Sequence, residues 1–112
     1  MNGITTHVLD TSVGRPAQGV GVLLEVLDGD GWTRIGSGST DADGRLADLL
    51  PSDRVEAATY QLRFDTAAYF GSRGVDGFYP EIAIRFRVTE AGARHHVPLL
   101  LSPFGYSTYR GS

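Results

Sequence analysis

The stretch that decides the fold lies at residues 20–39 and reads VGVLLEVL, then DGDG, then WTRIGSGS. Two runs of strand length flank a tight turn rich in aspartate and glycine, and this pattern is typical of a β-hairpin. A second turn of the same kind, DADG, follows at residues 41–44. Short strand-like runs separated by turns at regular intervals predict an all-β sandwich.

Further runs with similar boundaries predict the remaining elements. Tyr79 to Val88 places its apolar side chains on one face, as a half-buried strand requires. One short helix is expected at residues 67–70, capped by Asp65-Thr66 and stopped by Gly71. We expect a single domain over residues 1–112, with strands at 4–10, 20–27, 32–39, 59–64, 79–88, 94–101 and 106–110 and a short piece around Arg45.

The composition excludes several classes of protein. The chain of 112 residues fits one compact domain and has no cysteine, so disulfides and thiol catalysis are excluded. Its formal net charge is −3, and its ten basic residues, all arginine, do not form the basic stripe of a nucleic-acid-binding protein. The first residues carry no secretory signal, and no stretch is long enough to span a bilayer. We therefore expect a cytoplasmic protein with no membrane partner.

Three polar side chains are candidates for a functional site: His7, Arg45 and His96. Because side chains alternate between the two faces of a strand, His7 shares a face with Thr5, and His96 shares a face with Pro98. If the two strands belong to one sheet, polar groups lie among apolar ones on one surface. Such a surface is typical of a binding site or a wet interface.

Neighbouring residues have plainer interpretations. His95 points away from His96 by the same alternation, and we expect it to be structural. Tyr109 shares a face with Ser107 on the last strand. On residue type alone, Arg45 is an ordinary surface arginine that follows a hairpin turn.

Metal sites and other catalytic motifs are not supported by the spacing. An EF-hand loop needs glycine at its sixth position and glutamate at its twelfth. Counted from Asp41, Gly44 is fourth and Ser52 is twelfth, so both Asp-Gly turns are interpreted as hairpin turns. Adjacent histidines diverge in a strand and cannot easily share a zinc ion. Nucleophile elbows and phosphate loops are absent from the sequence, and we expect neither a metal nor a cofactor.

The strongest signal is the C-terminal run, which reads HVPLLLSP at residues 96–103 and YSTYRGS at residues 106–112. It resembles the terminal signature of 5-hydroxyisourate hydrolases, the enzymatic branch of the transthyretin family. The N-terminal run ITTHVLD at residues 4–10, followed by GRPA at 14–17, resembles the other conserved block of that family. The central DGR at residues 43–45 matches its arginine-bearing turn.

The resemblance implies a transthyretin-like sandwich of two four-stranded sheets with a short helix after the fifth strand. It also implies a homotetramer, with the sites where two dimers meet. It assigns catalytic roles to His7, Arg45, His96 and Ser112. Substrate binding is assigned to His7 and Arg45, together with Tyr109 and Arg110.

The implied reaction is the hydrolysis of a ring amide of 5-hydroxyisourate, a product of urate oxidation, to 2-oxo-4-hydroxy-4-carboxy-5-ureidoimidazoline. One of His7 and His96 is expected to activate water while the other orients the substrate or returns the proton, and either can take either role. Arg45 is expected to stabilise the oxyanion. The hydroxyl of Ser112, or a terminal carboxylate, positions the water. The alternatives are a non-catalytic carrier of a small planar ligand and a structural sandwich domain.

Overall fold

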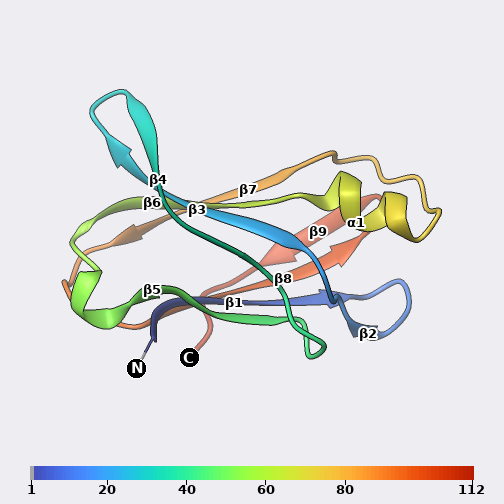
Figure 1. The fold of residues 1–112 in the computed structure, drawn as a ribbon, viewed down its shortest axis with the longest axis horizontal. Helices are drawn as coiled ribbons and strands as arrows, with labels where there is room; N and C mark the ends of the chain where they lie inside the picture. Colours follow the sequence, from blue (N-terminus) through green and yellow to red (C-terminus); the bar gives the residue numbers. More distant parts are fainter. Residues whose placement is uncertain (1) are drawn as a thin grey trace.

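The computed structural model describes residues 2–112, which fold into two packed β-sheets with one short α-helix at one end (Figure 1). This confirms the predicted all-β sandwich with one short helix. The first sheet contains β1 (Asn2–Asp10), β2 (Arg15–Pro16), β5 (Arg45–Pro51), β8 (His95–Ser102) and β9 (Gly105–Thr108). The second contains β3 (Gly21–Asp28), β4 (Gly31–Ser39), β6 (Ala58–Phe64) and β7 (Ile82–Val88). The helical elements are α1 (Thr66–Ser72) and a 3-10 turn at Ser52–Arg54.

The second sheet has the expected four strands, in the order β4-β3-β6-β7, but the first has five. Two short strands share one edge of β1: β5 pairs with its first half and β2 with its end. On the other edge, β1 runs parallel to β8, and β8 continues into the antiparallel β9. Strand β1 therefore lies in the middle of the first sheet.

The core fills the space between the sheets. Alternating residues of each strand point inward, so that Ile4 and Val8 of β1, Leu99 of β8, and Leu24 and Phe64 from the second sheet are fully buried. Of the residues that face outward on β1 and β8, Thr5, His7, Leu9, His96 and Leu100 are half-buried, and Pro98 is buried. The outer face of the first sheet therefore carries both candidate histidines on a rigid support.

Two expected strands differ from the observed ones. The strand predicted at residues 79–88 begins at Ile82, because the backbone before it pairs with the start of α1 instead. Thr66 Oγ1 donates to the Tyr79 carbonyl at 2.6 Å, and the Ala67 amide donates to the Pro80 carbonyl at 3.1 Å. The strand predicted at 106–110 spans Gly105–Thr108, so Tyr109 and Arg110 lie beyond its end.

The two Asp-Gly turns connect their strands in different ways. The turn at residues 28–31 closes the predicted β3–β4 hairpin, with Asp28 opposite Gly31. The hairpin interpretation is wrong for the turn at residues 41–44, because β4 and β5 lie in different sheets and the turn carries the chain between them. Gly44 has a φ of +76° there, and a Cβ would lie 2.3 Å from the Val8 carbonyl oxygen.

Helix α1 is held to the first sheet by a buried hydrogen bond. Asp65 caps the helix as predicted, since its carboxylate accepts from the Ala68 amide at 3.1 Å. The helix passes through Gly71 and ends at Ser72. Tyr69 donates its hydroxyl to the buried Asp10 carboxylate at 2.8 Å, and burial raises the pKa of Tyr69 to about 12. Within residues 2–112, no helix is long and apolar enough to cross a membrane.

Candidate functional site

The candidate site is built on the pairing of β1 with β8, two segments from opposite ends of the chain that lie side by side (Figure 1). Their parallel register sets Thr5 opposite His96 and His7 opposite Pro98. Both histidines therefore emerge from one face of one sheet, on adjacent strands and two positions apart in register. On the other edge of β1, Arg45 of β5 stands opposite His7.

His96 is held from two sides. Thr5 Oγ1 and His96 Nδ1 share a hydrogen bond of 2.7 Å. Beyond β9 the chain returns, and the Gly111 amide donates to the His96 carbonyl at 2.8 Å. Gly111 packs so closely that a Cβ at this position would lie 2.6 Å from Cδ2 of the imidazole ring. These contacts fix the ring and, within residues 2–112, leave Nε2 without a hydrogen-bond partner.

His7 and Arg45 are positioned by the turn at residues 41–44. His7 Nε2 donates to the Asp43 carbonyl at 2.9 Å, because a carbonyl oxygen can only accept. In neutral His7 the free lone pair is therefore on Nδ1. The Asp41 carboxylate accepts from the amides of Asp43 at 2.9 Å and Arg45 at 3.0 Å. This turn fixes the backbone of Arg45 and leaves its guanidinium exposed.

A cavity of about 270 Å³ opens between β1, β5 and β8. It collects residues from the start, the middle and the end of the chain: Thr5, Thr6, Arg45, Leu46, Ala47, Arg94, His96 and Ser112. A smaller hollow of about 120 Å³, which Gly111 also lines, shares Thr5, Arg94, His96 and Ser112 with it. Three predicted site residues, Arg45, His96 and Ser112, therefore line one cavity.

The environment of His96 favours its neutral form. Partial burial lowers the pKa of His96 below its ordinary value near 6.5, because burial disfavours the charged ring. The positive charges of His7, Arg45 and Arg94 lower this pKa further, which places all three groups within electrostatic reach of the ring. A neutral imidazole with a free nitrogen can accept a proton, and the cationic groups around it then favour release of that proton.

The other predicted residues lie beside this cavity. His7 does not line it, although its charge reaches His96. Tyr109 and Arg110 line a separate hollow of about 240 Å³ between β7 and the β8–β9 edge, which His96 also borders. His95 points away from His96 as predicted; it is buried and stacks on Phe86 with ring centroids 6.3 Å apart.

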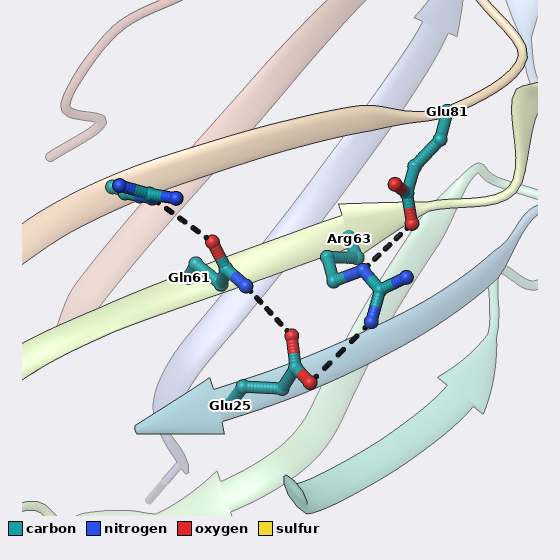
Figure 2. A network of polar contacts seen from close by, with 5 residues as sticks. Glu25, Gln61, Arg63 and Glu81 are labelled. Atoms are coloured by element: carbon teal, nitrogen blue, oxygen red, sulfur yellow. Dashed lines mark hydrogen bonds and ion pairs between the residues drawn. The ribbon is translucent and has the colours of Figure 1, made fainter. Parts of the chain in front are cut away.

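A larger hollow of about 660 Å³ lies on the outer face of the second sheet, and the charges of its Arg63 and Glu81 are paired with each other. Arg63 binds Glu81 at 2.6 Å and Glu25 at 3.4 Å, as Figure 2 shows. Gln61 donates to Glu25 at 2.8 Å and accepts from Arg85 at 3.1 Å. This network satisfies its own members, whereas the guanidinium of Arg45 has no hydrogen bond or ion pair among the described residues. The first sheet therefore carries the better candidate site.

Thr5 and Arg94 line the cavity but were not among the candidate site residues predicted from the sequence. Each lies two residues before a candidate histidine: Thr5 precedes His7 on β1, and Arg94, just before the start of β8, precedes His96. The alternation that assigned faces to the histidines was therefore a usable signal for both residues. Their contact with the same cavity depends on the β1–β8 register, which the sequence pattern does not contain.

Comparison with known proteins gives concordant results. Residues 4–111 match the HIUase/transthyretin family. The 5-hydroxyisourate hydrolase of Salmonella dublin is 45% identical over 111 residues, covering 99% of this chain and 82% of the relative. The crystal structure of transthyretin from Sparus aurata superposes with a TM-score of 0.93 at 32% identity, covering 99% and 97% of the two chains. Klebsiella pneumoniae 5-hydroxyisourate hydrolase superposes with a TM-score of 0.84 at 36% identity, covering 97% and 98%.

Proposed function

Since the chain belongs to the HIUase/transthyretin family, we propose that it is a 5-hydroxyisourate hydrolase, acting in the degradation of urate. The observation that carries this proposal is the convergence of His7, Arg45 and His96 on the outer face of the first sheet, beside one cavity. The name shared by its relatives supports the choice of substrate. The proposed product is 2-oxo-4-hydroxy-4-carboxy-5-ureidoimidazoline.

The reaction breaks one ring amide by adding water. The water oxygen bonds to the amide carbonyl carbon, the carbon–nitrogen bond breaks, and the nitrogen leaves with a proton. The new carboxylic acid then ionises to a carboxylate. A catalyst must therefore take a proton from water, stabilise the tetrahedral oxyanion and return a proton to the leaving nitrogen.

We assign the first step to His96 and the last to His7. His96 suits the role of base because its neutral form is favoured and its Nε2 is free. In this role its Nδ1–H donates to Thr5 Oγ1, which leaves the lone pair on Nε2 for the proton of water. His7 in its doubly protonated form would give the proton on Nδ1 to the leaving nitrogen, while its Nε2–H stays bonded to the Asp43 carbonyl. Proton transfer of this kind contributes about 10²–10⁴-fold to a rate.

Arg45 supplies positive charge for the oxyanion. Its guanidinium lines the cavity beside His96 and is unpaired among the described residues. A planar guanidinium offers several donors in a fixed geometry, so it can bind the carbonyl edge of the substrate while the negative charge develops. Ser112 lines the same cavity, and we assign its hydroxyl to the positioning of water.

We propose that the active form is a homotetramer with the sites where two dimers meet. Two observations support this. Tyr109 and Arg110 do not line the cavity of Arg45 in their own subunit, although the terminal signature contains both. Strands β7 and β9 each form an edge of their sheet, and edge strands are available for pairing with another chain. Assembly would pin the C-terminal tail and bring Tyr109 and Arg110 to a neighbouring site.

The second candidate is a non-catalytic carrier of a small planar ligand. Its supporting observation is the high TM-score with Sparus aurata transthyretin. A carrier would retain a ligand in stoichiometric amounts and release it unchanged, whereas a hydrolase would form the ring-opened product.

The test is the decay of freshly generated 5-hydroxyisourate with and without protein. The wild type should accelerate decay, while His7→Ala and His96→Ala should each lose most of that acceleration. Arg45→Gln should be slow. Arg34→Gln should act like the wild type, because Arg34 on β4 is exposed and has no partner within residues 2–112. Equal decay with wild-type protein and with buffer would rule out the hydrolase.

A further inference from the structure

The cavity beside His96 is cationic on two sides. Arg45 reaches it from β5, and Arg94 reaches it from the residue just before β8. Arg94 also lines the smaller adjoining hollow with Thr5 and Ser112. Among the residues that the structure describes, no aspartate or glutamate side chain lines either hollow.

Arg94 and Arg45 also lack internal partners. Throughout residues 2–112, neither guanidinium forms a hydrogen bond or an ion pair. Arg63, by contrast, binds two carboxylates, Arg73 binds backbone carbonyls, and Arg85 binds Gln61. Arg34 is also unpaired among the described residues, but it lines neither hollow. Two unpaired guanidinium groups at one concave site create a positive potential on a chain whose net charge is −3.

We propose that Arg94 is a second anion-binding residue of this site, which holds a planar anionic ligand together with Arg45. The identity of the ligand rests on the proposed function. The ring-opened product of that reaction carries a carboxylate that the ring amide lacked, so the negative charge of the ligand increases as the reaction proceeds. A guanidinium binds a carboxylate or a deprotonated ring edge through paired hydrogen bonds.

Arg94 and Arg45 have different relations to the reacting atoms. Arg45 stands opposite His7, whereas Arg94 lies two residues before His96 on the same side of the sheet. Arg94 is exposed and His96 is half-buried, so Arg94 lies at the rim of the cavity. A charge at the rim attracts an anion from solvent and holds it there, and salt screens this attraction.

The test is equilibrium binding of urate, a planar anion related to the substrate, measured by calorimetry at low and high salt. Wild-type protein should bind urate more weakly as salt increases. Arg94→Gln should raise the Kd about tenfold at low salt and flatten the salt dependence, since one charge-assisted contact is lost. Arg94→Lys should keep most of the affinity, and the control Arg34→Gln should match the wild type.

Each outcome decides the inference separately from the hydrolase assignment. Wild-type protein that fails to bind urate at millimolar concentration, or an Arg94→Gln variant with an unchanged Kd and salt dependence, would overturn the role of Arg94. A protein that binds urate through Arg94 but forms no product from 5-hydroxyisourate would keep this inference and contradict the hydrolase. A protein that hydrolyses 5-hydroxyisourate with a KM unaffected by Arg94→Gln would support the hydrolase and contradict the role of Arg94.

Discussion

Replacing Gly111 by alanine should impair catalysis without unfolding the protein. A Cβ at this position would lie 2.6 Å from Cδ2 and 3.2 Å from Cγ of His96, whereas ordinary contacts of a Cβ begin at 3.4 Å. The tail and the ring must therefore separate by about 1 Å. The φ angle of Gly111 is not in the left-handed region, so alanine can adopt the backbone conformation.

This separation should lower the rate of the reaction, because it displaces the His96 ring. His96 has its Nδ1 held by Thr5, so a push on the ring either breaks that hydrogen bond or moves Nε2 away from the water. A displacement of about 1 Å at a reacting group can reduce a rate by roughly a hundredfold. We therefore expect kcat for Gly111→Ala to fall between tenfold and about a hundredfold, with little change in the thermal midpoint because the tail is exposed.

Gly105→Ala is the matched control. It is the same substitution at the start of β9, and its Cβ would meet only Ser102 Oγ, at 3.8 Å. Rates of 5-hydroxyisourate decay and thermal midpoints should be compared for the wild type and both variants. If Gly111→Ala turns over substrate as fast as Gly105→Ala, the packing of the tail on His96 does not support catalysis, and the reasoning is refuted.

Three other measurements test the environment of His96 and the hydrogen bond between Tyr69 and Asp10. Thr5→Val should lower kcat by roughly fivefold, which corresponds to about 1 kcal/mol for a lost hydrogen bond. Thr5→Ser keeps the hydroxyl and should have a kcat near that of the wild type, so equal rates for Thr5→Val and Thr5→Ser would contradict the role of Thr5. Burial and nearby positive charges lower the pKa of His96, so the neutral base is lost only as pH falls through a value below 6.5. The acid limb of the kcat/KM profile should therefore lie below pH 6.5, and an acid limb at or above pH 6.5 would contradict His96 as the base. Tyr69→Phe should destabilise the fold by about 1.5–3 kcal/mol, because it removes the buried hydrogen bond to Asp10. Tyr106→Phe, at a half-exposed position, should have little effect on the thermal midpoint, and similar losses for the two would argue against the Tyr69 contact.

The sequence predicts the faces of the strands well, because alternation is a local property. It placed His7 with Thr5 and separated His95 from His96, and the structure agrees: His95 is buried while His96 is half-buried on the outer face. It did not predict that the first and eighth strands run side by side in parallel. That pairing joins Thr5 to His96 across 91 residues and depends on the packing of the whole sandwich.

The errors arose where tertiary contacts override a local pattern. The apolar run from Tyr79 extends the strand pattern, but Thr66 at the start of α1 captures the Tyr79 carbonyl. The turn before Arg45 has hairpin composition, yet its left-handed glycine lies against β1 and sends the chain to the other sheet. Residue type alone made Arg45 an ordinary surface arginine. Only the resemblance to a family drew attention to it, and the register explains why it stands beside His7.

A double-mutant cycle in the decay of 5-hydroxyisourate tests the central claim most directly, namely that residues from distant parts of the chain act on one substrate. The rates of His7→Ala, His96→Ala and the double variant should be compared with that of the wild type. Groups that act as a unit lose their effect together, so the double variant should be about as slow as the slower single variant. Losses that multiply, with the double variant slower by the product of the two single effects, would show that His7 and His96 act independently.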